Sequence, residues 1–171
     1  MKTTDLNPSE FAPFYKNYIY DLGEVNLLNI LNVSHQNILK TLTNLSEEKL
    51  NHSYAKGKWT IKEILQHLID AERILSYRAL RFSRNDQTEI SGYNEDFYVE
   101  NSNGKTRTKE NLLNEFNLVR NATIALFKSF SDEMLTNIGV ANNSNMSVRA
   151  LGFIIAGHQM HHLKVIKEKY L

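Results

Sequence analysis

The chain has 171 residues, of which 42% are hydrophobic and 23% charged, and its 20 basic and 19 acidic side chains give a formal net charge of +1. These values are ordinary for a globular protein, and the balanced charge gives no electrostatic reason to expect a nucleic acid or an anionic membrane as a partner. The chain has no cysteine, which excludes disulfides, thiolate ligands and a cysteine nucleophile. Any nitrogen-based metal site must therefore draw on the six histidines.

The length of the chain is most simply that of one domain, and we expect a single domain over residues 1–171. The first residues contain no apolar run like the core of a signal peptide. No stretch approaches the roughly 18 apolar residues that span a membrane. We therefore expect a cytoplasmic protein.

The first predicted helix covers residues 21–45. Both prolines, Pro8 and Pro13, precede it, so the rest of the chain is free of the strongest helix breaker. Side chains at spacings of three and four form one apolar stripe: Leu28, Leu31, His35, Ile38, Leu42 and Leu45. We interpret His35 as a hydrogen-bonded core residue, and a place in a metal pocket is the alternative.

A second helix is predicted to begin near Thr60, because Thr60 and Glu63 have the spacing of a capping box. Its apolar side continues to Phe82. His67 lies at the edge of that side, flanked by Glu63 and Asp70. From there its ring can reach a pocket between helices without displacing a core side chain.

The apolar periodicity disappears between residues 83 and 105, and turn-forming residues replace it. A segment of this length is typical of a functional loop or of a crossover between bundle helices that are not antiparallel. We expect Tyr93, Phe97 and Tyr98 to hold it against the helices. Tyr93 or Asn94 would then offer a polar group to a substrate pocket. The alternative is that the aromatic rings only fill a structural gap.

Two further helices complete the predicted fold. Residues 108–130 carry the third apolar stripe, and residues 137–145, with four asparagines, predict a loop. Ser147 is a suitable N-cap for the last helix. Four amphipathic helices with a long middle connection predict an all-α protein with a four-helix bundle. Phe153 points away from the His158 face of its helix, and we expect a homodimer with outward apolar residues of this kind in its interface.

The last predicted helix contains the main candidate residues for a metal site. His158 and His162 are four residues apart, so both rings can point at one ion. A zinc-type site needs a third ligand, and His67 is the best candidate. His161 points to the side and is expected at the rim of the site. The spacing alone is also compatible with a histidine-rich helix whose rings only form hydrogen bonds in the core.

Two segments around these histidines resemble the signatures of the DinB-like superfamily: GKWTIKEILQHLIDAERILSYRALRF and RALGFIIAGHQMHHLKVIKEKYL. They contain its His-Leu-x-Asp-x-Glu element and its Gly-His-x-x-His-His element. The resemblance covers roughly residues 20 to 171. It implies an up-down-down-up bundle, with the long crossover between the second and third helices, and a divalent metal ion held by His67, His158 and His162. Glu63, Asp70 and His161 are candidates to support the ligands or to act as a base.

The resemblance implies a metal-dependent enzyme that acts on small molecules, and some branches of the superfamily use a low-molecular-weight thiol. A thiol S-transferase, in which the metal activates a thiol cosubstrate, is one hypothesis. A metal-dependent hydrolase and a non-enzymatic metal-binding bundle are the alternatives. Three imidazoles suit several divalent metals, among which we prefer zinc or nickel. A zincin-type protease is disfavoured, because Gln159 and Met160 follow His158 and no His-Glu-x-x-His is present.

Overall fold

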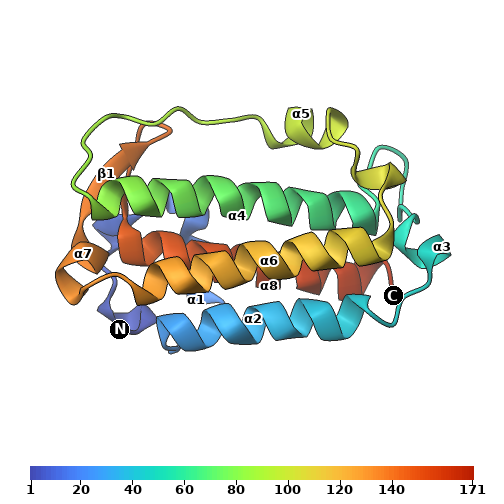
Figure 1. Ribbon diagram of the computed structural model, residues 1–171, viewed down its shortest axis with the longest axis horizontal. Coiled ribbons are helices and arrows are strands. Elements are labelled where there is room, and N and C mark those ends of the chain that lie inside the picture. Colours follow the sequence, from blue (N-terminus) through green and yellow to red (C-terminus); the bar gives the residue numbers. More distant parts are fainter.

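The computed structural model describes residues 1–171 and is built around four long helices that lie side by side (Figure 1). They are α2 (Leu27–Leu42), α4 (Ile61–Ser83), α6 (Lys109–Lys128) and α8 (Val148–Lys169). Around the bundle each helix packs against two neighbours, in the order α2, α8, α4, α6. Helices α2 and α8 run in one direction, and α4 and α6 run in the other. The predicted four-helix bundle with up-down-down-up topology is therefore confirmed.

Helices α4, α6 and α8 begin within one residue of the predicted starts. Helix α2 covers only Leu27–Leu42, after the N-cap Asn26, so the predicted span of residues 21–45 was too long. The Thr60 hydroxyl accepts the Glu63 N–H at 3.2 Å, and the Glu63 carboxylate accepts the Thr60 N–H at 2.7 Å. Thr108 and Ser147 accept backbone N–H groups in the same way at the starts of α6 and α8. These bonds satisfy donors that the first turn of a helix leaves free, which is why the sequence located the three starts so closely.

Shorter elements connect and cover the bundle. The helical ones are η1 (Thr3–Asp5), η2 (Pro8–Glu10), η3 (Pro13–Tyr15), α1 (Lys16–Tyr20), α3 (Glu47–Leu50), α5 (Glu95–Glu100), η4 (Gly104–Thr106) and α7 (Asp132–Thr136). Helix α1 packs directly on α8, because Gly157 leaves room for it. A Cβ atom on Gly157 would lie 2.1 Å from the carbonyl oxygen of Tyr18.

The crossover between α4 and α6 differs from the sequence prediction. It contains α5, and the residue that anchors it is Val99, which is buried. Phe97 and Tyr98 are 59% and 44% exposed, so the prediction that they hold the segment against the bundle was wrong. They line an open cavity between α5 and α4, and the single buried position of α5 is Val99. Tyr93 is half-buried and packs on Tyr98, with 5.0 Å between their ring centroids.

The predicted loop over residues 137–145 is also corrected. Strands β1 (Ile138–Ala141) and β2 (Ser144–Ser147) pair there as an antiparallel hairpin. Its two connecting residues, Asn142 and Asn143, have φ angles of 51° and 58°. Asparagine tolerates this left-handed conformation, which two-residue hairpin turns require. The asparagines that predicted a loop therefore mark the turn of a hairpin.

The core consists of two hydrophobic clusters that a polar layer separates. The larger cluster fills the end of the bundle that contains the hairpin and the start of α8, and the smaller one fills the opposite end. Between them every long helix contributes buried polar side chains: Ser34, His35, Glu72, Arg120, Thr123, His158 and Gln159. We call these residues the polar layer, and this layer is the part of the core in which buried polar groups are available for a functional site.

Phe153 belongs to the larger hydrophobic cluster and is 0% exposed. The expectation that it faces outward is therefore wrong, because α1 and the N-terminal segment cover the side of α8 that the sequence left open. A homodimer stays a prediction, now without Phe153 in its interface. None of the helices is both long and apolar enough to cross a membrane.

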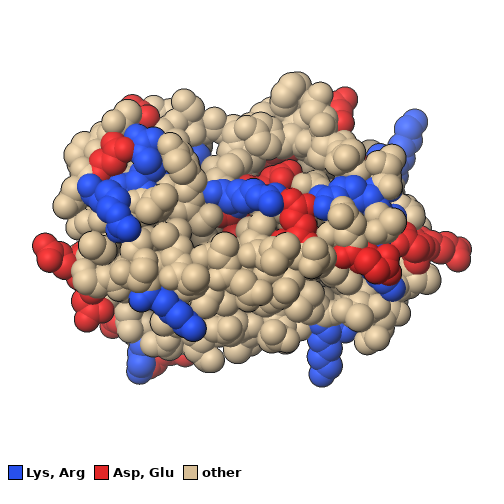
Figure 2. Space-filling view, viewed as in Figure 1, with Lys and Arg blue, Asp and Glu red and all other residues tan.

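Charged side chains of both signs alternate on the face shown in Figure 2. Ion pairs also join α4, α6 and the crossover, since Glu115 of α6 binds both Arg73 of α4 and Arg107 of the crossover. The smaller connection before α4 is fixed similarly, by Lys62 and Glu47 at 2.6 Å.

Candidate metal centre

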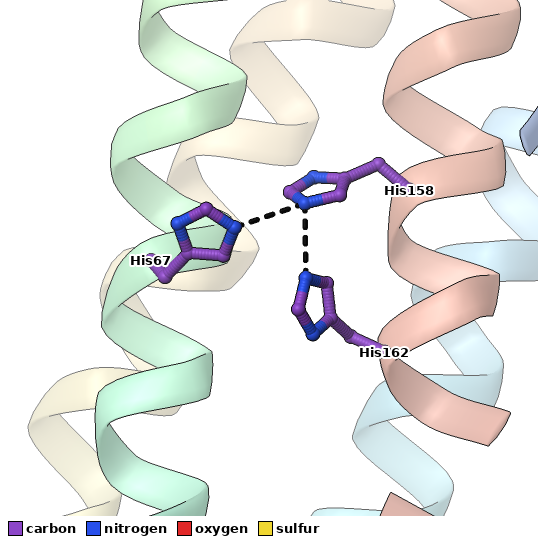
Figure 3. Close-up of side chains that lie close together, drawn as sticks. All are labelled: His67, His158 and His162. Carbon is purple, nitrogen blue, oxygen red and sulfur yellow. Dashed lines mark hydrogen bonds between the residues drawn. The ribbon is translucent and has the colours of Figure 1, made fainter. Parts of the chain in front are cut away.

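Three histidines from two helices meet at the edge of the polar layer (Figure 3). His67 lies on α4, and His158 and His162 lie one turn apart on α8. The Nε2 atom of His158 is 2.9 Å from that of His67 and 3.0 Å from that of His162. Each ring offers one nitrogen, and these nitrogens lie within 4.8 Å of one another.

These distances match the requirements of a shared metal ion. Nitrogen ligands bind zinc at about 2.0–2.1 Å, so two of them on one ion lie roughly 3–3.4 Å apart for ligand angles of about 90–110°. The two separations from His158 are close to this range, whereas the nitrogens of His67 and His162 lie within 4.8 Å of each other and would have to draw together around an ion. The three rings alone leave a four-coordinate ion one free position.

Burial keeps the three imidazoles neutral. It lowers the pKa of His67 to about 4, which the charge of Asp96 opposes, and lowers the pKa of His162 to about 3, with further contributions from His67 and His161. The pKa of His158 is lowered well below its usual value by burial and then by the neighbouring histidines. Neutral rings present free lone pairs, which is the form that binds a metal ion.

Two aromatic side chains enclose the triad. Trp59, just before α4, packs on His67 and His162, with ring centroids 4.9 and 6.5 Å away. Tyr18, on α1, packs on His158 from the other side at 5.5 Å. The carbonyl of Trp59 accepts a hydrogen bond from Tyr170 at 2.6 Å, which fixes the segment that carries the indole ring.

The triad opens to one side through a cavity of about 290 Å³. His161 and His162 line it, together with Asp96 from the crossover helix α5. His161 is exposed at the rim, as predicted, and packs on Tyr18 at 5.2 Å. The crossover therefore walls this cavity through Asp96, which the sequence analysis did not single out.

The two carboxylates that the sequence placed beside His67 are engaged elsewhere. Glu63 completes the capping box and binds Lys105 at 3.1 Å. Asp70 accepts a hydrogen bond from Gln66 at 2.9 Å and lines a cavity between α4 and α5. Neither lines the cavity that reaches His162.

The remaining candidates lie at defined places outside the triad. Tyr93 and Asn94 line a separate cavity toward the hairpin, which Asp96 also lines. His35 is buried in the polar layer against Phe116. Its Nε2 atom has no hydrogen-bond partner, contrary to the expected hydrogen-bonded core residue.

Sequence reasoning missed Tyr18, Trp59 and Asp96. The only available signal was for Trp59, which lies in the quoted GKWT segment one residue before the Thr60 cap. Tyr18 and Asp96 come from short elements far from the histidines in sequence. Their positions depend on how α1 and α5 pack, which no local pattern encodes.

Comparison with known proteins gives consistent results. The family model of the DinB superfamily matches residues 30–166. A protein of Oceanobacillus iheyensis, OB0413, named as a candidate metal-dependent hydrolase, is 24% identical over 132 residues, which cover 75% of this chain and 74% of that protein.

One solved structure shows the same fold. It is YfiT from Bacillus subtilis, described as a probable metal-dependent hydrolase with an unusual four-helix bundle topology. The two structures superpose with a TM-score of 0.75 at 17% sequence identity, over 83% of this chain and 82% of that one. At this identity the match concerns the fold.

Proposed function

This chain belongs to the DinB superfamily, and from that premise we propose that it is a metal-dependent hydrolase of small molecules, with His67, His158 and His162 as the ligands of one divalent metal ion. The observation that carries the proposal is the meeting of three neutral Nε2 atoms beside an open cavity. The names of the two relatives support hydrolysis as the reaction. We retain zinc or nickel as the preferred metals.

A divalent ion, when bound, supplies Lewis acidity, which makes a water molecule or a thiol acidic at neutral pH and polarises a carbonyl group. The side chains around it have separate tasks. The three imidazoles stay neutral and hold the ion, and the rings of Trp59 and Tyr18 keep bulk water from the sides of the triad.

Asp96 is our candidate for the proton acceptor in this reaction. Its carboxylate lines the same cavity as His162, whereas Glu63 and Asp70 line other cavities and already accept hydrogen bonds. Proton transfer by a positioned side chain contributes about 10²–10⁴-fold to the rate. We expect Asp96→Asn to reduce kcat by a factor in this range and to leave the metal content unchanged, while Asp132→Asn, on the distant helix α7, changes neither.

Metal analysis tests the ligand assignment. Protein purified without a nickel column should contain about one divalent ion per chain, and replacing any one of the three histidines by alanine should sharply reduce that content. His52, which lies outside the triad against Tyr170, provides the control, and His52→Ala should keep the ion. Stoichiometric metal in the triple variant would overturn the assignment.

The thiol S-transferase hypothesis uses the same residues, with a thiol in place of water. The two reactions are separated by measuring turnover of an electrophilic ester with and without an added low-molecular-weight thiol. Turnover without the thiol supports the hydrolase. Turnover that requires the thiol and yields a thioether or thioester would replace hydrolysis by thiol transfer.

The third hypothesis is a non-enzymatic metal-binding bundle. The coordination of the ion distinguishes it from the two enzymatic hypotheses. Three histidines with an exchangeable water molecule support catalysis, whereas a closed shell of protein ligands is typical of a structural site. The cavity beside His162 favours the open arrangement. X-ray absorption spectroscopy of the metal-loaded protein would report the number of protein and solvent ligands.

A further inference from the structure

Arg78 lies on the same helix as His67 and on nearly the same face. It follows His67 by about three turns of α4. At about 100° per residue the two positions are only about 20° apart around the helix axis. The crossover lies near both positions, since the carbonyl of Ser91 accepts a hydrogen bond from Arg78 and the charge of Asp96 acts on His67.

The guanidinium group of Arg78 is buried without a counter-ion. The residue is 2% exposed, and one of its terminal nitrogens donates to the carbonyl of Ser91 at 3.1 Å. Its Nε atom has no hydrogen-bond partner, and none of the ion pairs of the structure includes Arg78. Burying an unpaired charge is strongly unfavourable, so such a residue is a candidate for binding an anionic group.

Arg78 lines a cavity of about 420 Å³, the one that also contains Tyr93 and Asn94. Three segments build its walls: the N-terminal segment through Tyr15, the crossover, and the hairpin through Met146. Tyr15 precedes residue 30, where the match to the family model begins, so part of this cavity comes from a segment outside that match.

Two carboxylates line the same cavity, Glu95 and Asp96, and neither belongs to an ion pair. Burial, and then the charge of Asp96, raise the pKa of Glu95. A simple anion would be attracted by Arg78 but repelled by these carboxylates. A ligand with one negative and one positive group satisfies both kinds of side chain.

We propose that this cavity binds a zwitterionic amino-acid head group, with its carboxylate on the guanidinium of Arg78 and its ammonium on Glu95. A bidentate bond between guanidinium and carboxylate is among the strongest that a binding site can provide. Asp96 lines both this cavity and the one at His162, so the rest of the ligand extends past Asp96 toward the triad. The statement that this ligand is the substrate rests on the proposed function. The binding of the head group to this cavity is independent of that function.

Ligand-detected NMR titrations with three matched probes test the site. The probes are L-alanine, propionate, which lacks the ammonium group, and ethylamine, which lacks the carboxylate. L-alanine should bind at least about ten-fold more tightly than either of the others, because each of them loses one charge-assisted hydrogen bond. Equal binding of propionate and L-alanine would overturn the assignment of the ammonium to Glu95, and no binding of any probe would overturn the whole proposal.

Single substitutions test whether L-alanine binds at Arg78 and Glu95. Arg78→Met removes the charge and keeps the side-chain length, and should weaken L-alanine binding at least about ten-fold. Arg73→Met is the matched control: this arginine lies on the same helix but binds Glu115, and its replacement should leave binding unchanged. Glu95→Gln, on the exposed helix α5, should weaken the binding of L-alanine and leave the binding of propionate unchanged. Binding within two-fold of wild type in Arg78→Met would overturn the proposal.

The same titration in His162→Ala separates this proposal from the proposed function. L-alanine should bind this variant as it binds the wild-type protein, because Arg78 and Glu95 do not contact the triad. Metal analysis could contradict the histidine triad as a metal site while L-alanine binding still depends on Arg78. In that case the head-group site is supported and the proposed hydrolase function is not. Loss of L-alanine binding in His162→Ala would instead overturn the separate site.

Discussion

The polar layer of the bundle contains two buried clusters that differ in how their hydrogen bonds are completed. On one side, Arg120 is 0% exposed and donates to both carboxylate oxygens of Glu72 at 2.7 and 2.8 Å. It also donates to the carbonyl of Leu31 and the hydroxyl of Ser34. On the other side, the ring nitrogens of the three histidines approach only one another, and the amide of the adjacent Gln159 has no hydrogen-bond partner.

The difference separates a structural from a functional use of buried polar groups. The Glu72–Arg120 pair has charges and hydrogen bonds that the chain itself completes, so it needs no ligand. The triad has lone pairs that remain available once the rings are neutral. A buried cluster that the chain leaves incomplete, next to an open cavity, is where a ligand is expected.

The largest expected effect comes from breaking the completed pair. Glu72→Ala leaves the charge of Arg120 buried without a partner, and we expect it to reduce the free energy of unfolding by about 3–5 kcal/mol. Urea denaturation followed by circular dichroism measures this loss. The double variant Glu72→Leu, Arg120→Met should recover most of the stability, since it removes both charges. A loss below about 1 kcal/mol in Glu72→Ala would contradict the structural role of the pair.

The incomplete cluster should instead gain stability from its ligand. A divalent ion at about 100 times its Kd should raise the free energy of unfolding by about 2.7 kcal/mol, because it binds the folded state only. Thermal unfolding with and without a chelator measures this difference. His52→Ala should respond as the wild-type protein does, and His162→Ala should not respond. A chelator-sensitive melting temperature in His162→Ala would argue against the triad.

A third prediction concerns the aromatic wall of the triad. Gly157→Ala would place a methyl group against the backbone of Tyr18, so α1 must move away from α8. We expect a cost of about 1–3 kcal/mol, as for other overpacked sites, with exposure of His158 to solvent. Gly152→Ala is the comparison, because its methyl group would meet side-chain atoms of Leu27 and Phe127 at 2.7 Å and no backbone atom. Equal stability of the two variants in urea would contradict the role of Gly157.

The smallest expected effect comes from an ion pair closer to the surface, which tests whether burial decides the strength of such pairs. Arg149 donates to both carboxylate oxygens of Glu10, at 2.6 and 2.7 Å. Burial raises the pKa of Glu10, but the bonds from Arg149 and from the N–H of Asn7 outweigh burial and lower it below its usual value. Because the folded-state pKa is the lower one, this stabilisation is present above the pKa of the unfolded chain and is lost as the pH falls through the folded-state pKa.

The measurement for this pair is the stability difference between the wild-type protein and Glu10→Gln as a function of pH. We expect about 1–2 kcal/mol at pH 7, the range for a hydrogen bond to a charged group. The difference should begin to shrink below about pH 4.5, where this carboxylate becomes protonated in the unfolded chain, and should be lost once the pH falls below the lower pKa of the folded state. A difference that does not depend on pH between 7 and 3 would show that Glu10 contributes through packing and not through its charge.

The sequence by itself determined the bundle and the three histidines that meet in it. Helical periodicity and capping residues are local properties, so the starts of α4, α6 and α8 were predicted within about one residue. The pairing of His158 with His162 follows from helix geometry alone. His67 could be added because it lies at the edge of an apolar stripe, from which its ring can reach a pocket between helices, and because it matches the signature of the superfamily.

Tertiary structure decided what surrounds those histidines. Asp96, Tyr18 and the pairing of Glu72 with Arg120 join residues that are far apart in sequence, and their contacts depend on which faces of the helices pack together. The same is true of Phe153, which lies in the larger hydrophobic cluster, and of Phe97 and Tyr98, which α5 leaves exposed. Helical periodicity indicates that a side of a helix is apolar, but only the packed bundle determines which element covers it.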